Sequence, residues 1–171
     1  ANDLLNRLKA AGVRAKIDLS DKAPGWKYAE YEMRGVPLRV EIGPKDMEKE
    51  QCCIARRDTG EKTFVPLAEL ESTVAKLLDE VHDNMFAMAK KNLENNSFNA
   101  ETWEEVKELI EKNNGGFVHT KWCGDLACEL AMKEKVGVSS RCMPLAQSGT
   151  TGKCPVCGKE CTTDIIWGVA Y

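Results

Sequence analysis

The sequence predicts an α/β chain in which helices flank a mixed β-sheet, followed by a small α+β domain rich in cysteine. Helical and strand-like hydrophobic periods alternate over residues 1–96, which is typical of a sheet with helices packed against it. Six of the eight cysteines lie after residue 120. The short polar stretch "NNSFN" separates the two patterns, so we expect one domain over residues 1–96 and a second over 97–171.

Three helices are expected in the first domain. The first starts near the N-terminus and stops at Gly12, and the second runs between Pro24 and Gly35. The third is long, from Pro66 to about Asn96, with apolar residues at the 3.6-residue period. On the second helix, three side chains share one face and are expected to pack inward: Trp26, Ala29 and Met33.

The strands of the first domain follow from period-2 alternation. "VRAKIDLS" (13–20) alternates like a strand, and in "VPLRVEIG" (36–43) the apolar residues share one face. "GPKD" is expected to form a turn. "QCCIARR" and "KTFVPL" predict a hairpin around "DTGE".

In the second domain, we expect a helix over 100–116 capped by Asn99 and a strand "FVHTKW" (117–122). A short helix over 127–137 and strands "SRCMPL" and "DIIWGVAY" follow. "AQSGTTGK" (146–153) predicts a flexible connection between these strands.

The composition excludes several classes of protein. The net charge of −3 is not that of a generally basic nucleic-acid binder, although a local basic surface stays open. No apolar run approaches the ~20 residues that a membrane-spanning helix needs, so we expect no membrane association. Eight cysteines without a secretory signal favour a reducing compartment. The chain begins without Met and inside a helical pattern, so we expect it to be a fragment of a longer protein.

Two cysteine pairs predict a structural zinc site. Cys123 and Cys128 form one pair, and Cys154 and Cys157 form the other after a longer insert. Each short pair directs two thiolates inward, and the insert brings the pairs together around a tetrahedral ion. Four thiolates leave no open position for water, so the site would be structural. Free thiols in a small core, or a redox-active Cys154–Cys157 pair, are the alternatives.

The remaining candidate ligands are weaker. Cys161 is an alternate ligand, and His119 could replace a cysteine, but neither is needed for a four-thiolate site. Cys142 is expected to be buried on an apolar strand. Cys52 and Cys53 are adjacent on a strand, so they face opposite sides of the sheet and we interpret them as small apolar residues.

A second group of residues suits an unstacked RNA base. Tyr28 and Glu32 are four apart on the predicted helix, and the next strand directs Arg39 away from its apolar side, with Asp46 beyond it. Tyr28 can stack on a base, Glu32 can accept from guanine N–H donors, and Arg39 can reach guanine O6 and N7. The alternative is a surface of solvated charges with one exposed tyrosine.

The stretch "KAPGWKYAEYEMRGVPLRVEIGPKDMEKEQCCIARRDTGEK" closely resembles the anticodon-binding domain of prolyl-tRNA synthetases of the archaeal/eukaryotic type. The resemblance continues through "LLDEVHDNMFAMAKKNLENN" and into that type's zinc-binding C-terminal domain, "GGFVHTKWCGDLACE" and "KCPVCGK". It reaches the terminal "GVAY" and thus covers essentially the whole chain.

The resemblance implies a role for individual residues. The positions that match the family's anticodon readers are Tyr28, Glu32, Arg39 and Asp46, completed by a basic residue of the hairpin, Arg57 or Lys62. The zinc ligands of the family match Cys123, Cys128, Cys154 and Cys157. Tyr171 matches a C-terminal tyrosine whose carboxylate points toward the catalytic domain.

The resemblance also implies the activity of the parent enzyme. A class II synthetase, proline–tRNA ligase, would activate proline with ATP and esterify it to tRNA(Pro) in the cytoplasm, as a homodimer. Its catalytic domain, with ATP and Mg(II), would precede this fragment, whose own chemistry would be recognition and structural zinc. The alternative is a free-standing zinc-ribbon adaptor that binds protein. An independent enzyme is the weakest hypothesis, because the chain has no Gly-rich phosphate loop and only two histidines.

Overall fold

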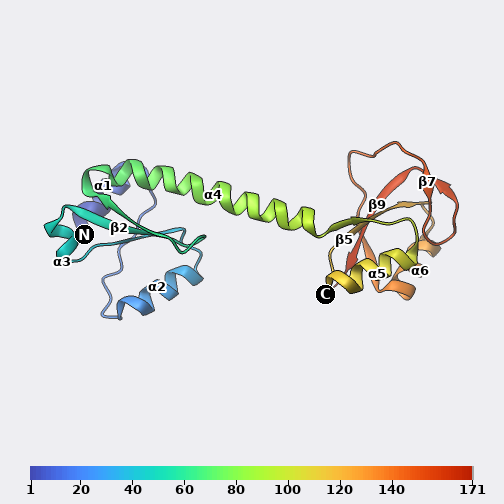
Figure 1. Cartoon of the computed structure of the whole chain (residues 1–171), viewed down its shortest axis with the longest axis horizontal. Helices are drawn as coiled ribbons and strands as arrows, with labels where there is room; N and C mark the ends of the chain where they lie inside the picture. The colour runs from blue at the N-terminus through green and yellow to red at the C-terminus, as the bar shows by residue number, and fades with distance from the viewer. Residues whose placement is uncertain (171) are drawn as a thin grey trace. The chain divides into compact units, whose positions relative to one another are not determined.

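The computed structural model describes residues 1–170, and Tyr171 lies outside the described residues. The chain divides into two compact units, Ala1–Ala89 and Lys90–Tyr171. The division falls inside a long helix, α4 (Leu70–Asn95), and thus before the Asn-rich stretch that follows this helix in the sequence. Figure 1 shows α1, α2 and β2 in the first unit, and α5, α6 and β9 in the second. Because each unit has its own sheet and core, each is described by itself.

The first unit is built on a three-stranded antiparallel sheet with the order β1-β2-β3. Its strands are β1 (Leu38–Glu41), β2 (Gln51–Arg56) and β3 (Lys62–Pro66), so the predicted hairpin is confirmed. The helices are α1 (Asn2–Ala10), α2 (Pro24–Met33), α3 (Pro44–Glu48) and α4, which a 3₁₀ turn over Leu67–Glu69 precedes.

The core of the first unit lies between one face of this sheet and helices α1 and α4. Leu4 and Leu8 of α1 and Val74 of α4 pack against Ile54 and Val65 of the sheet. In Figure 1, α1 and α4 lie on one side of the sheet and α2 lies on the other. The opposite face of the sheet is therefore on the side of α2, and this face of the sheet carries polar side chains, among them Arg39 and Lys62.

Several predictions for the first unit are wrong. Residues 13–20 form no strand, because alternation sets only which side chains face inward, and a strand also needs a neighbouring backbone. "GPKD" begins the short helix α3 instead of a turn. On α2, Trp26 is 50% exposed and Met33 is 87% exposed, so these side chains do not pack inward.

The second unit is built on a four-stranded sheet with the order β4-β5-β9-β6. β4 (Ser97–Asn99) pairs in parallel with β5 (Phe117–Trp122), whereas β9 (Thr163–Val169) pairs antiparallel with β5 and β6 (Val138–Cys142). The mixed sheet, expected in residues 1–96, therefore lies in the second unit, because every strand pair of the first sheet is antiparallel. Helices flanking sheets confirm the predicted α/β class. The other elements are α5 (Trp103–Asn113), α6 (Leu126–Val136), β7 (Gly152–Lys153) and β8 (Glu160–Cys161).

Trp167 of β9 is the largest fully buried side chain of the second unit. It packs with Val106 and Ile110 of α5 and with Met132 of α6. Its Nε1–H donates to Thr120 Oγ1 at 2.8 Å, so the indole is buried without an unpaired donor. None of the cysteines belongs to this cluster, which joins the sheet to both helices.

Two corrections concern the ends of elements in this unit. Asn99 does not cap α5, because it belongs to β4; Thr102 is the N-cap and accepts from the backbone N–H of Glu105. Cys142, expected to be buried, is exposed at the end of β6. In the part of the chain that the structure describes, no helix is long and apolar enough to cross a membrane.

Candidate nucleic-acid interface and metal centre

A row of three residues crosses the polar face of the first sheet. Arg39 of β1 pairs with Ala55 of β2, and Ala55 pairs with Lys62 of β3. Directly paired residues of antiparallel strands project on the same face, so Arg39 and Lys62 flank a small side chain. The register thus places two cations on either side of Ala55, on the face opposite the apolar core.

Helix α2 places an aromatic ring over this row. The Tyr28 ring centroid is 3.8 Å from Arg39 Cζ and 5.7 Å from Lys62 Nζ, so the guanidinium is stacked on the tyrosine. Glu32 lies one turn further along α2, and its Oε1 accepts from Arg39 Nη1 at 2.5 Å. The structure therefore brings together Tyr28, Glu32, Arg39 and Lys62 from three elements.

Glu41 of β1 links the two cations. Its Oε1 accepts from Arg39 Nε at 2.9 Å, and its Oε2 accepts from Lys62 Nζ at 3.2 Å. Burial raises the pKa of Glu41, but the hydrogen bonds and charges of Arg39 and Lys62 outweigh burial, so the net pKa is lowered. The carboxylate is therefore ionised at neutral pH. We name Tyr28, Glu32, Arg39, Glu41 and Lys62 the charged cluster.

Sequence reasoning missed Glu41. The sequence does contain a pattern that indicates Glu41, because Glu41 and Arg39 are two residues apart on one strand and therefore share a face.

The Arg39 guanidinium keeps one donor nitrogen open. Its Nε and Nη1 are occupied, and Nη2 has no hydrogen-bond partner among the described residues. A surface hollow beside the charged cluster is lined by Tyr28, Glu32, Arg39, Ala55 and Arg57, among others.

Asp46 and Arg57 lie differently from the charged cluster. Asp46 is in the first turn of α3, where its Oδ2 accepts from the Gly43 backbone N–H at 2.9 Å and so caps the helix. Arg57 lines the hollow, but its Nη2 lies 3.5 Å from Met85 Sδ of α4. Of the two basic residues considered for the hairpin, Lys62 is the one that lies over the Tyr28 ring.

The four paired cysteines meet at one point of the second unit. Cys123 follows β5, Cys128 lies in the first turn of α6, and Cys154 and Cys157 flank the turn between β7 and β8. Their Sγ atoms all lie within 4.8 Å of one another. Gly124 and Gly158, one residue after Cys123 and Cys157, have φ of +85° and +71°, which favours glycine in both knuckles.

The distances within the cysteine group fit a metal ion. Cys157 Sγ lies 3.8 Å from Cys123 Sγ. A tetrahedron with metal–sulfur bonds of about 2.3 Å has sulfur–sulfur edges of about 3.8 Å. The eight cysteines of the chain are all free thiols, so no disulfide competes with this arrangement. Four sulfur ligands at this spacing could hold one metal ion.

The surroundings of the thiols are unequal. Burial raises the pKa of the Cys128 thiol, and its bonds to the neighbouring thiols raise it further. Burial also acts on Cys154, but backbone N–H groups of Cys157, Val156 and Cys123 outweigh it and lower the pKa to about 7. The Cys154 thiol therefore ionises more readily than an ordinary thiol.

Two other candidate ligands and the C-terminal residue are outside this group. Neither Cys161 nor His119 belongs to the group of possible ligand atoms that lie within 4.8 Å of one another. The four paired cysteines alone make up this group. Cys161 ends β8, and burial raises the pKa of its thiol. Tyr171, expected to direct its carboxylate toward a catalytic domain, lies outside the described residues.

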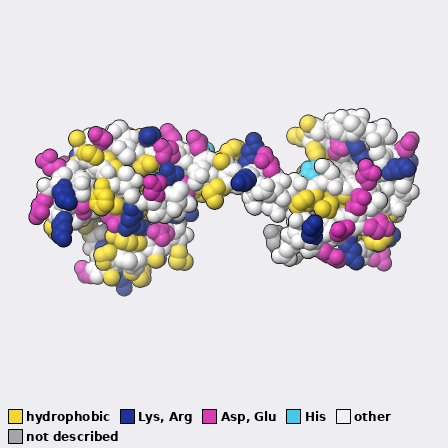
Figure 2. Space-filling model, viewed as in Figure 1, with side chains coloured by type: hydrophobic (Ala, Val, Ile, Leu, Met, Phe, Trp, Pro, Cys, Tyr) yellow, Lys and Arg dark blue, Asp and Glu magenta, His cyan; other side chains and the backbone are white. Residues whose placement is uncertain are grey.

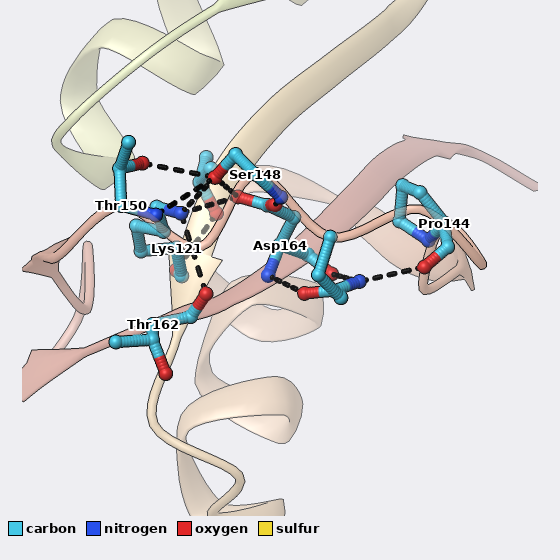
Figure 3. A network of polar contacts seen from close by, with 8 residues as sticks. Lys121, Pro144, Ser148, Thr150, Thr162 and Asp164 are labelled. Carbon is cyan, nitrogen blue, oxygen red and sulfur yellow. Dashed lines mark hydrogen bonds and ion pairs between the residues drawn. The ribbon is translucent and has the colours of Figure 1, made fainter.

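A polar network orders the chain that leads to the second cysteine pair. Lys121 Nζ donates to Asp164 Oδ1 at 2.5 Å and to Ser148 Oγ at 2.7 Å, and the three side chains point toward one another in Figure 3. Asp164 Oδ2 also accepts from the Ser148 backbone N–H at 2.5 Å. The segment 146–153, expected to be flexible, is therefore tied to β5 and β9. Lys121 itself lies two residues before Cys123.

Charges of both signs lie on the face of the molecule that Figure 2 shows. On the face shown in Figure 2, Lys and Arg side chains lie interspersed with Asp and Glu side chains on each unit. The charged cluster follows the same rule, because two carboxylates accompany its two cations. A nucleic acid would be recognised here by specific contacts more than by net charge.

Two family models match the chain. The model described as "Anticodon binding domain" matches residues 1–77, which include the charged cluster. The model described as "Prolyl-tRNA synthetase, C-terminal" matches residues 103–171, which include the four cysteines.

Curated relatives and a solved structure agree with these matches. Proline--tRNA ligase of Clostridium novyi (strain NT) is 48% identical over 171 residues, which are 100% of this chain and 35% of the relative. Proline--tRNA ligase 2 of Bacillus cereus is 48% identical over 92% of this chain and 33% of the relative. The crystal structure of prolyl-tRNA synthetase from Cryptosporidium parvum complexed with L-proline and AMP aligns with a TM-score of 0.89 at 34% identity. That alignment covers 99% of this chain and 36% of the other. The chain thus spans about a third of the length of the curated relatives it matches.

Proposed function

The chain belongs to the prolyl-tRNA synthetase family, and from this premise we propose that its first unit reads the anticodon of tRNA(Pro). The observation that carries the proposal is the stacked Tyr28–Arg39 pair with Glu32 and Lys62 around it. The relatives are named as proline–tRNA ligases, and we assign the ATP-dependent activation of proline to the part of them that this chain does not match.

Guanine is the base that this cluster suits best. Its O6 and N7 accept from a guanidinium, and its N1–H and N2–H groups donate to a carboxylate such as Glu32. Nη2 of Arg39 is the donor left for the base. We assign to the half-buried Tyr28 ring the stacking on the base, which is worth about 1–3 kcal/mol. Proline anticodons share two guanines, which agrees with a site that carries both donors and acceptors.

Contacts to phosphate would add affinity that depends on salt but not on sequence. Lys45, at the start of α3, is the basic residue that we assign to this role. Arg56 is less suited, because Asp58 and Glu80 both accept from it at 2.8–2.9 Å. Lys27 is likewise paired, with Asp18. On the resemblance to the family, we also assign Asp46 to the anticodon readers, with Arg57 as the alternative to Lys62 at the hairpin.

We propose that the four cysteines hold a structural Zn(II). Sulfur ligands, their spacing and the two glycine knuckles support zinc over hard cations, which prefer oxygen. When bound, the ion would neutralise the thiolates and join the two cysteine pairs. Because four thiolates fill the coordination sphere, the ion would not activate water. The second unit would then be a folded support for the rest of the enzyme, and two copies of the full-length enzyme would form a homodimer in the cytoplasm.

The test of anticodon reading is a substitution in the charged cluster. Arg39→Ala is expected to weaken binding of a tRNA(Pro) anticodon stem-loop by about 1.5–3 kcal/mol, because the charged hydrogen bond from Nη2 to the guanine is lost. Arg34→Ala, an exposed arginine of the α2 C-cap paired with Glu30, is the matched control and should change little. Fluorescence anisotropy at fixed salt gives both dissociation constants.

The same substitution separates recognition from chemistry in a complete relative. Aminoacylation of tRNA should fall, whereas proline-dependent ATP–pyrophosphate exchange should survive. Equal loss of both activities would refute the assignment. If the wild-type chain shows no preference for the proline anticodon over an anticodon-substituted control at low salt, a protein-binding adaptor becomes the better hypothesis.

A further inference from the structure

We propose that Glu41 is a positioning residue of the anticodon site, which sets the orientation of Arg39 and Lys62 before the RNA arrives. The inference rests on the proposed function of the charged cluster and adds a residue that has no contact of its own with the base. It predicts that an acidic side chain, which should repel RNA, is needed for the discrimination of guanine.

The register of the sheet gives Glu41 its position. Glu41 is two residues beyond Arg39 on β1, so both project on the same face, and its pair partner is Cys53 of the neighbouring strand. Cys53 is small and buried, so it leaves room for the Glu41 carboxylate close to the backbone of the sheet. The Glu41 side chain is only 20% exposed, and Arg39 is 21% exposed. The pair is thus partly shielded from water, and this shielding strengthens the charged hydrogen bond between Glu41 and Arg39.

The contacts of Glu41 restrict the guanidinium. Nε of Arg39 donates to Glu41, and the Tyr28 ring covers one face of the guanidinium at 3.8 Å. Stacking on Tyr28 fixes the plane of the guanidinium, and the hydrogen bond to Glu41 fixes its Nε. Together they block rotation of the guanidinium at the end of the Arg39 side chain. Nη2, which has no partner among residues 1–170, therefore keeps one direction. A donor held in one direction loses less entropy on binding than a mobile one.

Glu41 also permits two cations to share one aromatic ring. Arg39 Cζ lies 3.8 Å and Lys62 Nζ lies 5.7 Å from the Tyr28 ring centroid. Because both groups are positively charged, they repel each other at this spacing. Glu41 accepts from both, at 2.9 Å from Arg39 and 3.0–3.2 Å from Lys62. Without this carboxylate, we expect Lys62 to move into solvent and Arg39 to sample other rotamers, so that the cluster opens.

Positioning and simple electrostatics predict opposite results for the removal of this charge. If Glu41 acted only through its charge, Glu41→Gln would strengthen RNA binding for every sequence, because a negative charge leaves a phosphate-binding face. If Glu41 positions Arg39, the preference for guanine falls while non-specific binding stays equal or rises. The ratio of affinities for two RNAs separates these cases, since it cancels the electrostatic contribution.

The experiment uses the whole 171-residue chain and two stem-loop RNAs. One RNA carries the two anticodon guanines of tRNA(Pro), and the other carries adenines at those positions. Glu41→Gln is expected to lower the guanine-to-adenine affinity ratio by roughly tenfold, the value of one hydrogen bond between charged groups. Glu61→Gln is the matched control, because Glu61 is exposed in the β2–β3 turn and the charge change is identical. Its ratio should stay unchanged.

Two further variants make the result decisive. In an Arg39→Ala background, Glu41→Gln should no longer lower the ratio, because the residue through which it acts is gone. Glu41→Asp, which keeps the charge, should retain more of the ratio than Glu41→Gln. Circular dichroism melting of each variant identifies loss of fold, and a fall in ratio that persists in the Arg39→Ala background overturns the inference.

Failure of this inference differs from failure of the proposed function. If the wild-type chain has no preference for guanine, the proposed function fails. If the wild type prefers guanine and Glu41→Gln has the same ratio or binds both RNAs more tightly to an equal degree, anticodon reading stands and the role of Glu41 is overturned.

Discussion

The two candidate sites of this chain are held together in opposite ways. The charged cluster is complete by itself, because Glu32 and Glu41 accept from Arg39, and Glu41 also accepts from Lys62. The cysteine group brings four sulfur atoms within 4.8 Å with only weak thiol contacts between them. The first site satisfies its own charges, whereas the second needs a cation once its thiols ionise.

This difference suits two kinds of function. When a ligand binds to a cluster whose charges are already paired, hydrogen bonds within the cluster are exchanged for hydrogen bonds to the ligand. Such binding is reversible and selective. A group of thiolates around an ion gains so much from the ion that binding and folding become one event. We therefore expect loss of the ligand to leave the first unit folded and to unfold the second.

Removal of the metal is the strongest test of this comparison. Structural zinc supplies an apparent ~10–16 kcal/mol, which is also folding energy, so a chelator should unfold the second unit and leave the first unit folded. Hydrogen exchange resolved by segment measures both units in one sample. Cys154→Ser should reproduce the effect, whereas Cys142→Ser should not, because Cys142 is exposed and outside the group. Protein purified without chelator that contains no metal would contradict the prediction.

A smaller effect should come from the core of the second unit. Thr120→Val removes the acceptor of the buried Trp167 indole N–H, which leaves the donor unsatisfied at a cost of about 1–3 kcal/mol. Urea denaturation of the metal-loaded chain measures the free energy of unfolding. Thr120→Ser keeps the hydroxyl and serves as the control. If Thr120→Val is as stable as the wild type, the metal holds this unit without help from the buried hydrogen bond.

The smallest expected effect concerns the pH dependence of the stability of the first unit. Arg56 donates to Asp58 and lowers its pKa to about 2 from an ordinary 3.8, against burial and with help from Asn84. The stabilisation is fully present above pH 3.8 and is lost as the pH falls through about 2. In Asp58→Asn, the stability of the first unit should fall less over this window. Asp83→Asn, on an exposed part of α4, should behave like the wild type.

The cysteine site could be predicted from the sequence nearly in full. Its ligands come in two local pairs, and the glycines that follow Cys123 and Cys157 adopt the positive φ that a knuckle requires. Spacing along the chain is enough here, because each knuckle is only a few residues long. The long helix and the β2–β3 hairpin were predictable for the same reason, since their hydrophobic periods are local.

The charged cluster could be predicted only in part. The resemblance and the helix period indicated Tyr28, Glu32 and Arg39, but the contact between Arg39 and Lys62 through Glu41 depends on strand register across the sheet. The inward packing of Trp26 and Met33 was wrong, because the period of a helix does not reveal how much of a face a neighbour covers. The strand expected at 13–20 was wrong, because alternation does not supply a pairing partner.

By itself, the sequence determined most of the elements, the two cysteine pairs and the family, since each depends on residue types at short spacing. Only the tertiary structure decided which side chains of α2, β1 and β3 meet over Ala55, and that Glu41 stands between two cations. It also decided that Asp46 caps α3 and that 146–153 is tied down by Lys121 and Asp164. The physical reason is that hydrogen bonds between distant segments depend on register and packing, which short-range patterns do not encode.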